Sequence, residues 1–260
     1  MDELRSAIAR DDLEATLAAL AADESPSMTP ERLGLELDRL ADRIAPYVGA
    51  VELPRRLGRL VYGMFLRLGF RTPETYGDPE LHLVDRVIAR REGSPVALAA
   101  VLIALGRRFD VPLAGVAFPG HFMVRYEAAS PVFIDPSSGA FPFPADSLLS
   151  LAAEALRVRP EDGERFLAPV STRTLAVRLL QNLQRAYEER GDRGRSMLVL
   201  DRLYEITGSP IARCDRGLRA AALGAPHAAA DDLAAYLVDH RDADVARTLA
   251  RLERGPLSLN

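Results

Sequence analysis

The sequence predicts an α+β protein. A helical N-terminal part leads to a buried helix that packs on a small antiparallel sheet, and α-helical repeats follow. Residues 96–105, VALAAVLIAL, are apolar on nearly all sides, as in a helix buried within a domain. Residues 122–126 alternate apolar and polar positions like a strand. A spacing of 33 residues recurs in the C-terminal third and indicates a repeat.

The composition is that of an ordinary globular protein. The chain has 260 residues, 33 basic and 37 acidic, with a formal net charge of -4 and no concentrated basic stripe, which disfavours nucleic acid as a partner. The charged start lacks the apolar core of a signal peptide, and no apolar run is long enough to span a membrane. The single cysteine, Cys214, excludes an intrachain disulfide and suits a reducing compartment. We expect a cytoplasmic protein.

Residues 1–75 form the expected helical N-terminal region. Thr29 and Pro30 have the character of an N-cap followed by a proline in the first turn. A stripe of apolar residues at spacings of four, three and four follows, made by Leu33, Leu37, Leu40 and Ile44. Residues 54–68 repeat this amphipathic pattern, which predicts a further helix.

Residues 76–165 form the expected core. A short helix ends near Gly93, and Ser94 and Pro95 open the buried helix. Strands are expected from residue 113, over residues 122–126 and over residues 132–134. Residues 137–145 read as a loop, and residues 146–156 as a closing helix. A linker over residues 160–169 marks the expected domain boundary.

Residues 170–255 form the expected helical repeats. Gly191 and Gly224 are 33 positions apart, as are Leu200 and Leu233. Paired helices joined by a glycine turn at this period are typical of tetratricopeptide-like hairpins, whose repeat is about 34 residues.

The strand region carries the residues with chemical potential. His121 stands before one strand, and Asp135 ends the next apolar run. Pairing of these strands would bring imidazole and carboxylate together, and such a pair supplies two members of a nucleophilic triad. The remaining histidines have no metal-like spacing, so the sequence predicts no metal site and no cofactor. Those histidines are His82, His227 and His240.

A resemblance to a known family rests on residues 90–125 and on the later FIDPSSGA segment. The helix start at Gly93–Pro95, the PGHF motif at 119–122 and the IDP segment at 134–136 resemble those of bacterial SirB-type transglutaminase-like proteins, over about residues 33–252. The resemblance implies a papain/transglutaminase-like fold, with the nucleophilic cysteine at the start of the central helix. Counting back from the turn at residues 110–112 places that position on Pro95, which implies lost or altered activity. Cys214, where an arginine is expected, and Ser137, where an aromatic residue is common, depart from the pattern.

Each member of the dyad has two interpretations. His121 is a general base or ligand contact, which we favour, or a histidine that only satisfies neighbouring groups. Asp135 either orients the imidazole or caps the turn before Pro136. Ser94 could be activated by His121, although an N-cap role, with the hydroxyl accepting a helix amide, is the stronger prediction.

Charged residues near the dyad are candidates for binding. Arg125 shares the expected face of His121 and could bind a carboxylate or phosphate, or form a salt bridge to Glu92 or Asp135. Arg91 and Glu92 precede the central helix and would lie near any pocket at its start. Charged side chains at a helix end are, however, usually exposed to solvent. Cys214 is expected to be a packing residue.

Two functions follow as hypotheses. The first is a catalytically inactive transglutaminase-like protein that binds a protein or peptide, because helical repeats present concave binding surfaces. The second is an amide hydrolase or acyl transferase that uses His121 and Asp135 with Ser94 or water, and that needs an oxyanion hole. The sequence leaves the oligomeric state open.

Overall fold

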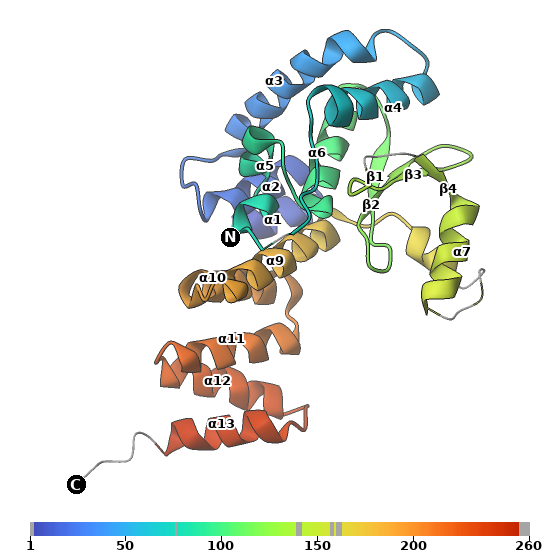
Figure 1. Cartoon of the computed structure of the whole chain (residues 1–260). Coiled ribbons are helices and arrows are strands. Elements are labelled where there is room, and N and C mark those ends of the chain that lie inside the picture. The colour runs from blue at the N-terminus through green and yellow to red at the C-terminus, as the bar shows by residue number, and fades with distance from the viewer. Residues whose placement is uncertain (1–2, 76, 139–141, 157–158, 160–162, 255–260) are drawn as a thin grey trace. The chain divides into compact units, whose positions relative to one another are not determined.

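The computed structural model describes residues 3–75, 77–138, 142–156, 159 and 163–254. The chain divides into two compact units between residues 179 and 180 (Figure 1). We call residues 1–179 the N-terminal unit and residues 180–260 the C-terminal unit. The chain is mostly helical with one small antiparallel sheet, which confirms the predicted α+β class.

The N-terminal unit places helices before and around the sheet. Its helices are α1 (Glu3–Ala9), α2 (Leu13–Ala22), α3 (Pro30–Val48), α4 (Leu53–Val61), α5 (Val84–Arg90), α6 (Pro95–Arg108) and α7 (Ala145–Leu156). Shorter turns are the π-helix η1 (Tyr62–Arg67) and the 3-10 helices η2 (Pro79–His82) and η3 (Glu164–Leu167). No helix of the described residues is long and apolar enough to cross a membrane.

Helix α3 shows why the N-terminal pattern is helical. The Thr29 hydroxyl accepts a hydrogen bond from the Arg32 amide at 3.2 Å, and Pro30 occupies the first turn, as predicted. The four apolar residues of the predicted stripe are all buried. The helix expected over residues 54–68 begins at Leu53 but changes to a π-helix at Tyr62.

Helix α6 is the centre of this unit, as predicted. Every residue from Val96 to Gly106 is buried. The helix contacts α2, α3, α4 and α5 as well as strands β1 (Leu113–Val116) and β2 (Met123–Tyr126), and Figure 1 shows it beside the sheet. A helix with neighbours on most sides needs an apolar surface all round, which explains its sequence.

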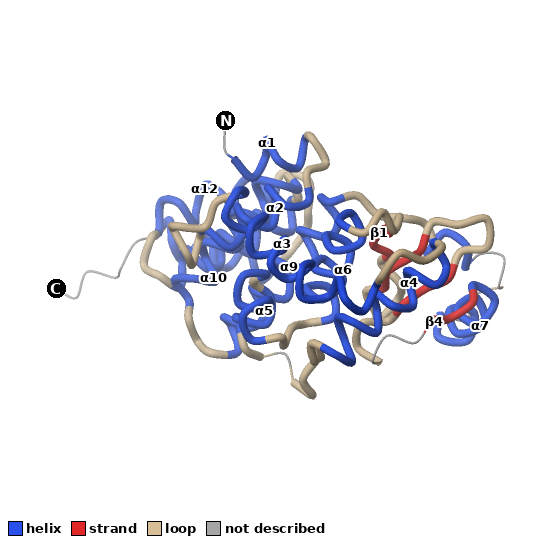
Figure 2. Tube along the Cα trace, turned by 90° about the horizontal axis from the view of Figure 1, so that it is seen from above, coloured by secondary structure: helices blue, strands red, loops and turns tan. Residues whose placement is uncertain are grey.

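The sheet has the order β1-β2-β3-β4 with antiparallel neighbours, where β3 is Val132–Ile134 and β4 is Pro142–Pro144. Strand β4 corrects the prediction of a loop over residues 137–145, of which residues 139–141 lie outside the described part. The two prolines of β4 favour the prediction of a loop, because proline is found in a sheet mainly on an edge strand, and β4 is such a strand. Phe143 pairs with buried Phe133. Helix α7 lies beside β4 (Figure 2).

The division between units differs from the predicted boundaries. Helices of the region 1–75 pack on α6, so this region and the core are one compact unit. The division falls inside helix α9 (Thr172–Glu189) instead of the expected linker, whose residues 160–162 lie outside the described part. The segment before α9 and the first residue of α9 are tied to the rest of the N-terminal unit, since the Val170 amide donates to the Gly115 carbonyl at 2.8 Å and the Thr172 amide donates to Asp11 Oδ1 at 2.9 Å.

The C-terminal unit continues with α10 (Arg193–Thr207), α11 (Pro210–Ala222), α12 (Pro226–Leu237) and α13 (Ala243–Glu253). Gly191 and Gly224 occupy equivalent turns, with φ of 71° and 78°, and Leu200 and Leu233 are both buried. The predicted repeat of helix, glycine turn and helix is therefore present, in the manner of tetratricopeptide-like hairpins.

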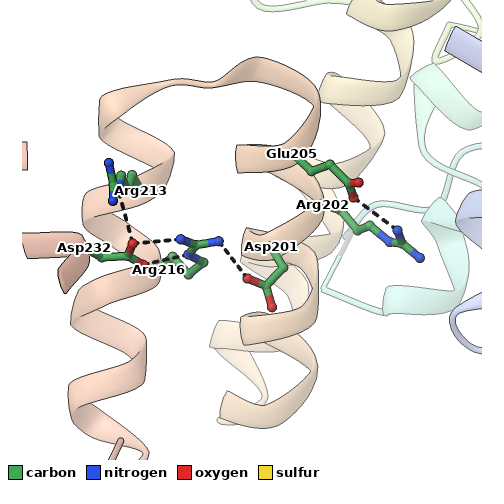
Figure 3. Close-up of polar contacts among 6 residues, drawn as sticks. All are labelled: Asp201, Arg202, Glu205, Arg213, Arg216 and Asp232. Atoms are coloured by element: carbon green, nitrogen blue, oxygen red, sulfur yellow. Dashed lines mark hydrogen bonds and ion pairs between the residues drawn. The ribbon is translucent and has the colours of Figure 1, made fainter. Parts of the chain in front are cut away.

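An ionic network joins three helices of this unit (Figure 3). Arg216 of α11 donates two hydrogen bonds to Asp232 of α12, both at 2.7 Å, and one to Asp201 of α10 at 3.2 Å. Arg213 adds a third bond to Asp232 at 3.1 Å, and the Arg216 guanidinium lies 4.5 Å from the centre of the Tyr204 ring. Burial of Asp232 opposes its ionisation, but the hydrogen bonds from Arg216 and Arg213 prevail and lower its pKa.

Candidate functional site

A tight turn places His121 at the mouth of strand β2. The His121 amide donates to the Phe118 carbonyl at 2.9 Å across Pro119 and Gly120, and Gly120 has a φ of 76°. Proline followed by glycine at positive φ is typical of a type II turn. The PGH sequence therefore fixes the backbone position of His121, two residues before β2.

Pairing of β2 with β3 brings Asp135 to the imidazole. Val124 of β2 pairs with Ile134 of β3, and Asp135 follows directly. His121 Nδ1 lies 3.2 Å from Asp135 Oδ2, so the predicted proximity is confirmed. We call these two residues the dyad.

Asp135 has both of the roles that the sequence left open. One oxygen, Oδ2, faces the imidazole. The other, Oδ1, accepts hydrogen bonds from the Ser137 amide at 2.8 Å and from the Ser137 hydroxyl at 2.6 Å, which is an Asx-turn. Ser137, an unexpected residue at its position, therefore holds the carboxylate in place.

The dyad is open on the histidine side. The His121 side chain is 53% exposed, whereas that of Asp135 is 11% exposed. With Nδ1 turned to the carboxylate, a neutral ring carries its proton on Nδ1 and presents a lone pair on Nε2. The pair can therefore accept a proton or hydrogen bond from a bound molecule.

Ser94 does not take part in this site. It precedes α6 and is fully buried, with its amide donating to the Leu81 carbonyl at 2.8 Å. Its hydroxyl has no hydrogen-bond partner in the described structure, neither a helix amide nor the His121 ring. The predicted side-chain cap is wrong, because backbone hydrogen bonds alone fix this residue, and the geometry for activation by His121 is absent.

Arg125 is engaged elsewhere. Its Nη1 donates to the Leu167 carbonyl at 3.1 Å, and its Nε lies 3.2 Å from Glu127 Oε1. Among the described residues, the ion pair of Arg125 is therefore made to Glu127, two positions along the chain, and the alternative of a salt bridge to Glu92 or Asp135 is wrong.

Arg91 and Glu92 also have structural partners. Arg91 ends α5 in the left-handed conformation with a φ of 59°, and its Nη1 donates to the Leu68 carbonyl at 2.9 Å. Glu92 forms an ion pair with Arg71. Within the described part of the chain, neither residue bonds to the dyad.

Cys214 is a packing residue, as expected. It is buried in a cluster with Leu233 and Val245. Burial, with the nearby carboxylates of Asp215 and Asp242, raises the pKa of its thiol to about 11. A thiol of this kind is protonated at neutral pH and is a poor nucleophile.

Sequence reasoning found the dyad but missed its supports. The Pro119 and Gly120 turn was visible in the PGH motif, because this dipeptide predicts a type II turn. Ser137 gave a weaker signal, since a serine two residues after an aspartate is compatible with an Asx-turn but does not require one.

Residues 31–181, more than half of the chain, match the family model described as the transglutaminase-like superfamily. The chain belongs to this superfamily.

The relatives define the chain more closely. A UPF0162 protein of Xylella fastidiosa (strain 9a5c) is 32% identical over 238 residues, which are 86% of this chain and 83% of the relative. Protein SirB1 of Salmonella typhimurium is 32% identical over 98 residues, 36% of this chain and 35% of SirB1. The chain is thus a bacterial SirB-type protein. Among solved structures, a thermophilic TPR protein of Thermus thermophilus is similar over 95% of this chain and 93% of its own, with 18% identity and a TM-score of 0.28.

Proposed function

We propose that this protein is a catalytically inactive transglutaminase-like protein that binds a protein or peptide segment at the dyad. One observation supports the proposal most strongly. The dyad is intact and open, while the helix start at which papain-like and transglutaminase-like enzymes carry their nucleophile holds Pro95, the first residue of α6. Proline has no nucleophilic atom.

Acyl transfer requires a nucleophile beside the imidazole, so a proline at the helix start argues against this chemistry. A nucleophile must come within about 3 Å of the imidazole that takes its proton. The neighbouring Ser94 hydroxyl is buried and has no hydrogen bond to the ring. An amide hydrolase or acyl transferase built on Ser94 is therefore disfavoured, and the corresponding enzyme would have to use water.

Binding uses the same atoms without a reaction. Nε2 of an imidazole oriented by Asp135 can accept a hydrogen bond from a backbone or side-chain donor, and a half-exposed ring adds apolar contact area. The helical repeats of the C-terminal unit support a role in protein recognition, since such repeats present extended binding surfaces as a class.

Affinity capture with the full chain tests the proposal. We expect the unmodified protein to retain a partner from bacterial lysate, and the His121→Ala variant to lose it. Arg55→Ala is the control, because Arg55 is exposed on α4, outside the dyad and the repeats. A partner retained equally by the unmodified chain and both variants contradicts a role for the dyad.

An activity panel separates binding from catalysis. We expect no turnover of amide or ester substrates that depends on His121. Turnover that the unmodified chain shows and that His121→Ala and Asp135→Asn both lose would establish the hydrolase instead.

A further inference from the structure

A groove in the N-terminal unit lies outside the dyad and has the properties of a ligand site. Helices α3 and α5 and the segment before α3 enclose about 580 Å³, within the range of small-ligand sites. We call this the α3–α5 groove, and six of its lining residues carry its polar groups: Ser25, Arg32, Arg39, Arg43, Asp85 and Arg86.

One side of the groove is cationic. Arg39 and Arg43 are exposed one turn apart on α3 and both line the groove. In the part of the chain that the structure describes, neither has a hydrogen-bond or ion-pair partner. Arg32, by contrast, donates to the Ser27 hydroxyl at 2.8 Å. Two unpaired guanidinium groups on successive turns can hold carboxylates through paired hydrogen bonds.

The other side offers a buried acceptor. Asp85 is 8% exposed, and its Oδ2 accepts a hydrogen bond from the Ser25 hydroxyl at 3.0 Å. Arg86 Nε lies 3.6 Å from the same oxygen. The remaining oxygen, Oδ1, is buried without a hydrogen-bond partner among the described residues. Buried carboxylate oxygens are rarely left without a donor, and Asp85 lines the groove, so its carboxylate can take a cationic partner there.

We propose that the α3–α5 groove binds a short acidic peptide with a free α-amino group. The ammonium group pairs with the Asp85 carboxylate, and the carboxylates of the peptide pair with Arg39 and Arg43. Phosphate alone would match the arginines but supplies no ammonium group for the carboxylate of Asp85, which also lines the groove. The site is separate from the dyad and does not depend on the function proposed there.

Calorimetry with the full chain tests both halves of the site. The probe is the tripeptide Glu-Glu-Glu with a free amino group, compared with its N-acetylated form and with inorganic phosphate. We expect saturable binding of the free tripeptide, at least about tenfold weaker binding of the acetylated form, and weaker binding still of phosphate.

Variants assign the contacts. Arg39→Ala with Arg43→Ala should weaken binding at least about tenfold, and Asp85→Asn should remove the preference for the free amine. Arg55→Ala is the matched control, because Arg55 is exposed on α4 outside the groove, and His121→Ala should leave binding unchanged. Circular dichroism checks that each variant is folded.

Three results would overturn the proposal. The first is no binding of the free tripeptide at about 1 mM, near the weak limit of specific recognition. The second is equal affinity for the free and acetylated peptides, or for phosphate, which would make the groove a general anion site. The third is an equal loss of affinity in the Arg55 control, which would indicate nonspecific charge attraction.

Discussion

Asp232→Asn should destabilise the C-terminal unit by about 3 kcal/mol in the free energy of unfolding, the low end for removing one partner of a buried ion pair. The side chain of Asp232 is only 8% exposed and accepts three hydrogen bonds from two arginines. Asparagine removes the charge that neutralises them. The loss of stability is limited because Arg216 keeps its hydrogen bond to Asp201. In addition, the Arg213 side chain is 34% exposed and can hydrogen-bond to water instead.

The network also predicts a pH dependence. The pKa of Asp232 is lowered in the folded state against burial, by Arg216 and then Arg213, so the unfolded chain binds this proton more readily. The contribution to stability is therefore complete above the unfolded pKa of about 3.9 and is lost as pH falls through the lower folded value.

Urea unfolding followed by circular dichroism measures the effect, and hydrogen exchange of α11 and α12 amides localises it. Asp231→Asn is the matched control, because Asp231 is the exposed neighbour on the same helix, and surface changes usually stay within about 0.5 kcal/mol. Equal unfolding free energies for the two variants, or an acid profile that Asp232→Asn leaves unchanged, would refute the reasoning.

Three further experiments have expected outcomes. Gly120→Ala should lower the free energy of unfolding by about 1 kcal/mol, because Gly120 has a φ of 76° that alanine adopts only with strain. Gly58→Ala should raise it by a similar amount, because Gly58 lies inside α4 with open space around it. A thermal unfolding temperature that shifts in the same direction for both variants would contradict this prediction. Ser94→Ala should stabilise the chain by up to about 1 kcal/mol, because its buried hydroxyl has no partner among the described residues, and a clear loss in urea unfolding would show that the hydroxyl has a role. Cys214 should react slowly with iodoacetamide at neutral pH and rapidly in urea, because burial and two carboxylates raise its pKa to about 11; rapid alkylation of the folded chain would contradict its burial.

The parts of the fold that follow from period and pairing were predictable. The apolar surface of helix α6 predicts its burial, and the order of two neighbouring strands predicts that His121 and Asp135 lie close together. The 33-residue spacing located equivalent turns at Gly191 and Gly224. Each of these depends on local pattern, or on elements adjacent in the sequence.

The parts that depend on distant partners were not predictable. Strand β4 exists because Phe143 pairs with Phe133, although its prolines favour a loop. The start of α9 is held in the N-terminal unit by hydrogen bonds to Gly115 and Asp11, far away in the sequence. The partners of Arg125, and the unused hydroxyl of Ser94, depend in the same way on how segments meet in space.

The two turns that hold the dyad have a consequence for how much sequence change this site tolerates. The Phe118–His121 turn and the Asx-turn at Asp135 are each closed by residues within three positions of one another. The imidazole and carboxylate are thus aligned by short-range bonds and one strand pairing, without a hydrogen bond to the start of α6 in the described part of the chain. Residues 94 and 95 can therefore vary independently of the orientation of His121, so the pairing of imidazole and carboxylate places no constraint on which residue opens α6.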